Sequence, residues 1–182
     1  MARSDVKVQL ISDEVAADDD FIVVAARPNT AATLANSSFA SGGARLLGVT
    51  TTGTGDNAKT NTIVGTDVFD NALTEVIVST GSAEQVDGTK FFKTVTSITS
   101  SEQFAANIKI GSLASAAQAV FGGRVRLKGY SIVSGGTAGV IEFINGTPED
   151  GTVLFKARTI GTDNTTLDNT IPEDGIVFEN GL

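Results

Sequence analysis

Two alternating apolar stretches decide the fold, Ile63-Val64-Gly65-Thr66-Asp67-Val68-Phe69 and Leu73-Thr74-Glu75-Val76-Ile77-Val78. Both are rich in β-branched residues, and an alternation of period two is typical of strands with one buried face. The residues between them, Asp70-Asn71-Ala72, favour a short turn. The two stretches therefore predict an antiparallel hairpin.

Similar strand-like patterns recur along the whole chain, separated by Gly, Asn and Asp turns. We expect further strands at 6–11, 21–27, 45–52, 91–99, 107–110, 124–133, 140–145, 152–160 and 176–179. The two best helix candidates are short: 101–107 could form one turn, and the Ala-rich stretch 113–121 is either a helix or a linker. This pattern predicts an all-β protein built as a sandwich or barrel.

The composition changes near Gly122-Gly123, and we place a module boundary between Gly111 and Gly123. The expected organisation is an N-terminal arm (1–20), a β-sandwich module (21–112) and a smaller C-terminal β module (123–182). Both modules are expected to be small, antiparallel and sandwich-like or jelly-roll-like.

Asn-Gly pairs at 145–146 and 180–181 predict tight turns, because both residue types tolerate positive φ. The second pair predicts a hairpin whose return strand is missing, since only Leu182 follows it. An open edge of this kind is a template for association with another chain.

The chain has 182 residues, of which 41% are hydrophobic and 19% charged, as in ordinary folded proteins. It contains no Cys, no His and no Trp. Disulfides, thiolate metal sites and Ser-His-Asp catalysis are therefore excluded. Paired carboxylates for sugar hydrolysis remain, but such enzymes usually present aromatic platforms, and aromatic residues make up only 6% here. We expect no enzymatic activity and no cofactor.

Thirteen Lys and Arg against 21 Asp and Glu give a net charge of −8 and a pI near 4.4. An acidic surface repels phosphate backbones, so we expect no nucleic-acid partner. No apolar run is long enough for a membrane span, and residues 1–5 do not start a signal peptide. The chain is expected to be soluble and made in the cytoplasm.

Several short motifs match binding sites only loosely. Residues 53–60 (Gly-Thr-Gly-Asp-Asn-Ala-Lys-Thr) nearly form a phosphate-binding P-loop, but Ala58 replaces a glycine, Asp56 opposes an anion and a strand follows. Asp18-Asp19-Asp20 and the group Asp163, Asn164 and Asp168 offer oxygen ligands for calcium without the spacing of a known loop. Acidic turn residues are usually just solvated, so we assign no metal site.

Two sets of residues are candidates for protein contacts. Arg124, Arg126 and Lys128 alternate along one predicted strand, where they form either a solvated face or a surface for an acidic partner. Ile176, Phe178 and Leu182 lie on or beside the predicted open edge at the end of the chain.

Residues 42–182 contain motifs that resemble a known class of proteins. They are Gly65-Thr66-Asp67, Asp70-Asn71, Thr74-Glu75-Val76, the stretch 89–98 and, in the second module, Gly129-Tyr130, 135–139 and 171–176. Together these motifs resemble small β-sandwich virion structural proteins of tailed bacteriophages, of the decoration or cement type. The resemblance marks a fold and a setting, and it assigns no functional residue.

The resemblance implies a virion structural protein that acts through contacts with copies of itself and with major capsid or tail proteins. Capsid decoration is the expected role, with the chain made in the host cytoplasm and incorporated into the virion. A tail, neck or fibre component remains an alternative. So does a receptor- or carbohydrate-binding module that presents loops such as 135–139.

Overall fold

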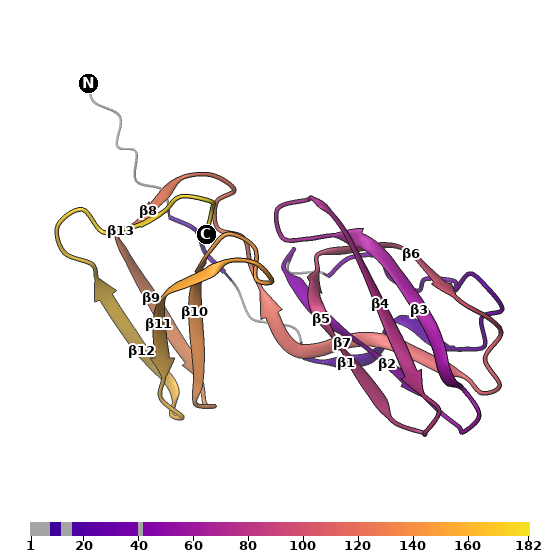
Figure 1. The fold of residues 1–182 in the computed structure, drawn as a ribbon. Coiled ribbons are helices and arrows are strands. Elements are labelled where there is room, and N and C mark those ends of the chain that lie inside the picture. Colours follow the sequence, from indigo (N-terminus) through magenta and orange to yellow (C-terminus); the bar gives the residue numbers. More distant parts are fainter. Residues whose placement is uncertain (1–7, 12–15, 40–41) are drawn as a thin grey trace. The chain divides into compact units, whose positions relative to one another are not determined.

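The structure is a computed structural model that describes residues 8–11, 16–39 and 42–182. The described residues form strands, turns and loops without any helix, and all sheets are antiparallel, so the predicted all-β fold class is confirmed. Within this part of the chain there is accordingly no helix capable of crossing a membrane. The chain divides into two compact units, Met1–Gln118 (unit 1) and Ala119–Leu182 (unit 2), both visible in Figure 1.

Unit 1 is a two-sheet sandwich. Its strands are β1 (Asp18–Ala26), β2 (Ala44–Thr51), β3 (Asn57–Thr66), β4 (Ala72–Thr80), β5 (Gln85–Phe92), β6 (Thr94–Ser100) and β7 (Ile108–Ala117). One sheet has the order β1-β7-β2-β5 and the other the order β4-β3-β6. Every one of these strands contributes a buried apolar side chain to a single core, in which Leu47, Ile63, Phe92 and Ile110 are fully buried. The side chains that point inward along each alternating strand therefore form the core.

The hairpin predicted from 63–78 is present as β3 and β4, joined by residues 67–71. Asp67 holds the turn, because its carboxylate accepts hydrogen bonds from the backbone N–H groups of Phe69 and Asn71 and from the Asn71 amide. Asp70 adopts a positive φ of 66°, a conformation that Asp tolerates better than most residues.

The prediction of one strand over 91–99 is wrong. The chain crosses from one sheet to the other at Lys93, so this stretch belongs to β5, which pairs with β2, and to β6, which pairs with β3. Alternation alone does not reveal such a crossing, because Phe92 and Val95 are both buried in the same core.

The helix candidates are also wrong. Residues 101–107 form turns and loop, and most of 113–121 extends β7, which pairs with β2 as far as Ala117. Sheet pairing overrides the helix propensity of the alanines. In the predicted arm, Val8–Ile11 are not a strand, Asp18–Asp20 belong to β1, and residues 1–7 and 12–15 lie outside the described residues.

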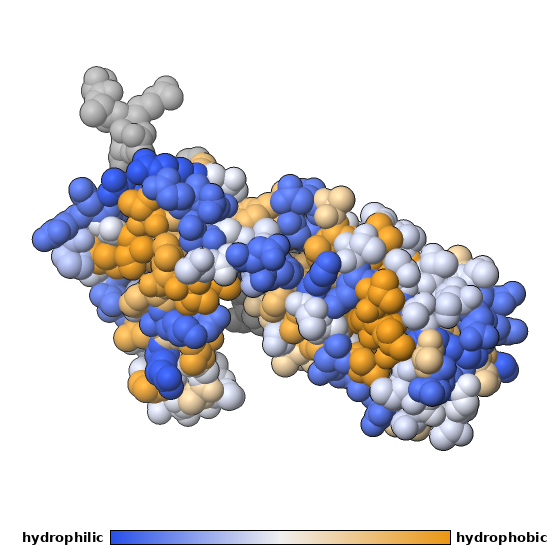
Figure 2. Space-filling view, viewed as in Figure 1, coloured by the Kyte–Doolittle hydropathy of each residue, from blue (hydrophilic) through white to orange (hydrophobic). Residues whose placement is uncertain are grey.

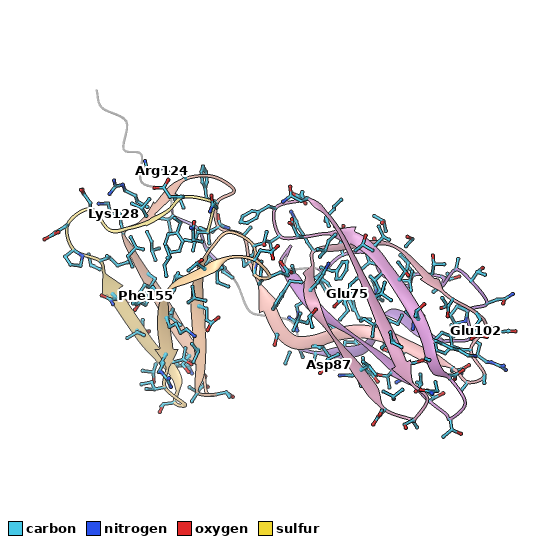
Figure 3. The ribbon with its side chains drawn as sticks, in the orientation of Figure 1. Glu75, Asp87, Glu102, Arg124, Lys128 and Phe155 are labelled. Carbon is cyan, nitrogen blue, oxygen red and sulfur yellow. The ribbon has the colours of Figure 1, made fainter. Side chains whose placement is uncertain are left out.

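A buried carboxylate on β4 forms hydrogen bonds to β5, and these two strands are edge strands of different sheets. Glu75 on β4 accepts hydrogen bonds from the backbone N–H of Thr89 (2.6 Å) and of Lys90 (3.4 Å) on β5. The Lys90 ammonium donates in return to the Thr74 carbonyl. Figure 3 labels Glu75 among the side chains of unit 1. These bonds satisfy edge groups that would otherwise be open for pairing.

The segment between β1 and β2 covers the opposite side of the sandwich. It bonds to β6 through Ser100 N–H to Thr30 O and Val95 N–H to Ser37 O, and to β1 through Ala35 N–H to Ile22 O. Both margins of unit 1 are thus joined by its own residues.

Unit 2 is built from short strand pairs. Its strands are β8 (Val125–Leu127), β9 (Gly129–Gly135), β10 (Gly139–Asn145), β11 (Thr152–Thr159), β12 (Asp163–Thr170) and β13 (Ile176–Phe178). They form three two-stranded antiparallel sheets, β10-β11, β12-β9 and β13-β8. Tyr130, Phe143 and Phe155 pack on one another with ring centroids 5.3–5.6 Å apart, yet all three stay partly exposed. Phe178 and Ala157 are the buried apolar residues of this fully described unit.

The end of the chain differs from the prediction of a hairpin with a missing return strand. β13 already pairs with β8, and the residues after it bond within unit 2. Asn180 N–H donates to the Asn145 side chain and Gly146 N–H donates to Gly181 O, so the two Asn-Gly pairs lie together. Leu182 exchanges backbone hydrogen bonds with Phe121. Asn145-Gly146 opens a longer loop between β10 and β11, not a two-residue turn.

Candidate functional site

The basic row at the start of unit 2 is matched by acceptors of its own unit. Arg124 pairs with the Glu179 carboxylate at 2.7 Å, Arg126 donates to the Asp174 carbonyl at 3.2 Å, and Lys128 donates to the Glu173 carbonyl at 3.0 Å. Figure 3 labels Arg124 and Lys128. Because these groups already have internal partners, the row offers less attraction to an acidic surface than isolated cations would.

The three apolar residues expected at an open edge have different positions. Phe178 is fully buried and cannot contact another protein without unfolding of unit 2, so its assignment to an interface is wrong. Ile176 and Leu182 are partly exposed, but each lies in a backbone segment that is paired within the unit. The sequence does not show this pairing, because the partner of β13 lies about 50 residues earlier and that partner, β8, is only three residues long.

The P-loop-like stretch contains a buried carboxylate that is bonded within unit 1. Asp56 is fully buried, accepts the backbone N–H groups of Ala105 (2.6 Å) and Ala106 (3.1 Å), and pairs with Lys59 at 3.0 Å. Burial alone raises the pKa of Asp56, but the hydrogen bonds from Ala105, Lys59 and Ala106 outweigh it and lower the pKa below its usual value. The bonds of Asp56 therefore connect the start of β3 to the loop before β7.

The acidic triplet at the start of β1 gathers around a cation of the same chain. The carboxylates of Asp18, Asp19 and Asp20 lie within 4.8 Å of one another, and the Lys109 ammonium lies 3.1 Å from Asp19 and 3.9 Å from Asp20. A hydrogen bond to Asp18, together with some loss of solvation and the neighbouring negative charges, raises the pKa of Asp20. A hydrogen bond to Asp19 raises the pKa of Lys109. The arrangement is that of an exposed ion-pair cluster.

The other group that was considered for calcium, Asp163, Asn164 and Asp168, lies on β12. Asp163 uses its carboxylate to accept the backbone N–H of Asn164, which adopts a positive φ of 56° at the start of β12. The group therefore shapes a turn.

A small cavity in unit 2 is too small for most ligands. It has a volume of about 70 Å³ and is lined by Ile132, Ile160 and Leu167 together with Ser134, Arg158 and three threonines. Sites for small molecules and cofactors typically measure about 300–1,000 Å³. The cavity is best explained as loose packing between the strand pairs of unit 2.

The most distinctive surface of the molecule is apolar and lies on unit 2. We call it the unit 2 apolar surface. It covers parts of both faces of the strand pairs, since Val140 and Ile141 are consecutive in β10, and its residues are Val133, Val140, Ile141, Leu154, Ile160 and Leu167. Val133 is 62% exposed and Ile160 is 58% exposed. Hydrophobic residues gather over the strands of unit 2 in Figure 2, and a smaller patch lies over β4 of unit 1. Isolated exposed apolar side chains are normal, so the feature of interest is the number of them on one small unit.

Unpaired strand edges accompany this surface. Among the described residues, each of the strands β9 to β12 pairs with one neighbour only. β9 and β11 lie beside each other, and Ser134 Oγ donates to the Ile160 carbonyl. The outer edges of β10 and β12 pair with no further strand of the described chain, and open edges of this kind can recruit another strand.

Sequence analysis missed this surface, although a signal was present. β10 reads Gly-Val-Ile-Glu-Phe-Ile-Asn, with apolar residues at consecutive positions on both faces. Strands with both faces apolar are normally covered on both sides. In this structure Val140 and Ile141 are exposed instead.

The outer face of the β4-β3-β6 sheet carries a smaller group of exposed apolar side chains. Val76 and Val78 are about half-exposed on β4, and their cross-strand neighbours on β3 are Thr62 and Thr60. This face is more polar than the unit 2 apolar surface, since threonine hydroxyls alternate with the valines.

Comparisons with protein-family models, curated proteins and solved structures gave no match to this chain. The functional argument therefore rests on the chemistry of its surfaces.

Proposed function

We propose that this chain is a structural subunit of a tailed-bacteriophage virion, most specifically a capsid decoration protein, that acts by packing against copies of itself and against capsid proteins. The observation that carries the proposal is the unit 2 apolar surface together with the unpaired edges beside it. The phage setting comes from the resemblance of residues 42–182 to small virion proteins.

The physical argument concerns how little of unit 2 is buried. A unit of about 60 residues buries a smaller share of its surface than a larger domain and is marginal by itself. Its two buried apolar residues, Ala157 and Phe178, form a very small core. Burying a fully exposed Val, Leu or Ile contributes about 1.5–3 kcal/mol, and covering these roughly half-exposed side chains would contribute about half of that each. Association would therefore supply stability that the isolated unit lacks.

The ring cluster argues against the alternative of a carbohydrate-binding module. Tyr130, Phe143 and Phe155 use their faces to pack on one another, and Asn169 donates to the Tyr130 hydroxyl. These rings help to hold unit 2 together, whereas a sugar platform presents its ring faces outward.

The test is to incubate purified protein at micromolar concentration with purified tailed-phage capsids and, separately, with tails, and to measure co-sedimentation. We expect binding to capsids. Binding to tails alone would place the subunit in the tail, neck or fibre and overturn capsid decoration. A protein that remains monomeric and binds neither particle would overturn the whole proposal.

A further inference from the structure

One short apolar segment of unit 1 has no structural role within the described part of the chain. Val8–Ile11 are not in a strand, and Val8 and Leu10 are 92% and 85% exposed. Among the described residues, the one hydrogen bond of this segment is between the Gln9 amide and the neighbouring Leu10 carbonyl. Val8 and Leu10 alternate with a polar residue, which is the pattern of a strand with one apolar face.

The edge of β10 has the complementary properties. Its four apolar residues, Val140, Ile141, Phe143 and Ile144, give it more apolar side chains than the other open strand, β12, which has only Leu167 and carries two aspartates. The single charge on β10, Glu142, is paired with Lys156 on β11 at 2.5 Å. An incoming uncharged strand would therefore meet apolar side chains and a neutralised carboxylate.

We propose that Val8–Ile11 of one copy adds as an antiparallel or parallel strand to the open edge of β10 in a second copy. A segment of four residues spans about 13 Å as a strand, which fits along the seven residues of β10. Backbone hydrogen bonds to the edge provide the attachment, and Val8 and Leu10 cover part of the unit 2 apolar surface.

This inference rests on the proposed assembly function and specifies how one contact is made. The segment and the edge belong to every copy, so each copy can donate one strand and accept another. Such an arrangement links successive copies into a closed ring or a continuous array, and geometry decides between the two.

The chain has no cysteine, so introduced cysteines report contacts without background. Two full-length variants carrying different affinity tags, Leu10→Cys and Val140→Cys, are mixed and mildly oxidised, and disulfide-linked heterodimers are measured on non-reducing gels. The matched control replaces Val140→Cys with Val76→Cys, at a valine of similar exposure on unit 1. We expect cross-linking of position 10 to position 140 at least tenfold above cross-linking of position 10 to position 76.

A second variant tests the energetics in otherwise unmodified protein. The pair Val8→Asp and Leu10→Asp should raise the dissociation constant of the homo-oligomer by about 100-fold, because two apolar side chains lose their cover. Circular dichroism should show unchanged strand content, since both residues lie outside the sheets.

The outcomes separate this inference from the proposed function. If the oligomer or the capsid complex forms normally while positions 10 and 140 fail to cross-link and the aspartate pair has no effect, strand addition is wrong and assembly stands. If neither self-association nor particle binding occurs, the proposed function is wrong, and strand addition between copies is wrong with it.

Discussion

Units 1 and 2 are both antiparallel β structures, yet they treat their apolar residues in opposite ways. Unit 1 packs side chains from seven strands into one core, and its own residues join both margins of the sandwich. Unit 2 buries only Ala157 and Phe178 among its apolar residues, and its sheets have two strands each. It leaves six large apolar side chains exposed on its four longer strands and next to them, as many as the described part of unit 1 does, although unit 2 has only about half the length. The difference in core size supports the proposal that unit 2, and not unit 1, makes the contacts with other chains.

The largest expected effect breaks the core of unit 1. Phe92→Ala should reduce the free energy of unfolding of unit 1 by about 3–5 kcal/mol, because the ring is fully buried between the two sheets and leaves a cavity. Chemical denaturation measures the loss. Val76→Ala, at a half-exposed position on the same unit, should change stability by less than about 0.5–1 kcal/mol. Equal losses for the two variants would contradict the assignment of the core.

A smaller effect concerns the margin between β4 and β5. Glu75→Ala removes the acceptor of the Thr89 and Lys90 backbone N–H groups and should lower the stability of unit 1 by about 1–3 kcal/mol. The exposed Glu102, labelled with Glu75 in Figure 3, provides the control, and Glu102→Ala should be nearly neutral. If Glu75→Ala were as mild as the control, the claim that unit 1 closes its own margin would be wrong.

How far the sequence predicts the structure depends on the same contrast between units. Alternating residues locate β4 and β11 well, because exposed residues alternate with less exposed ones along both strands. The predicted strand 63–69 covers only the end of β3 and runs into the turn 67–71, because Val68 and Phe69 continue the apolar pattern beyond the strand. The pattern misses β12, Asp-Asn-Thr-Thr-Leu-Asp-Asn-Thr, because that strand has only one apolar side chain and is held by backbone pairing to β9. Phe178 is misplaced for a related reason: its burial depends on β8, a distant partner.

The pH dependence of stability sharpens the view of unit 1 as a scaffold. Folding lowers the pKa of Asp56 below its value in the unfolded chain, which is about 3.9. The Asp56 carboxylate therefore contributes its full stabilisation at pH values above about 3.9. This stabilisation is lost as the pH falls through the pKa of Asp56 in the folded state. Asp56→Asn should destabilise unit 1 by about 1–2 kcal/mol at neutral pH, since an amide offers one acceptor oxygen to the Ala105 and Ala106 N–H groups.

The loss of stability caused by Asp56→Asn should become smaller in acid. Unfolding curves at neutral pH and near pH 2 measure the gap between the variant and the unmodified chain, which should narrow as the Asp56 carboxylate is protonated. A gap that stays constant over this range would show that the charge of Asp56 contributes nothing.

The smallest expected effect lies on the basic row of unit 2. Arg124→Ala breaks an exposed ion pair with Glu179 and should change stability by less than about 1 kcal/mol. It should also leave self-association unchanged, because the row is satisfied internally. Self-association is measured by light scattering. Its loss in this variant would show that the row of Arg124, Arg126 and Lys128 does contact another chain.

The central claim is that the unit 2 apolar surface is covered by a second copy in the assembled protein. The most direct measurement is the molar mass in solution across a range of concentrations, for the full chain and for a variant combining Val133→Ser, Val140→Ser and Leu154→Ser. We predict a multiple of the 18.7 kDa chain mass for the unmodified protein and a shift towards the single-chain mass for the variant, with the unfolding of unit 1 unchanged. A single-chain mass for the unmodified protein at every concentration would contradict the claim.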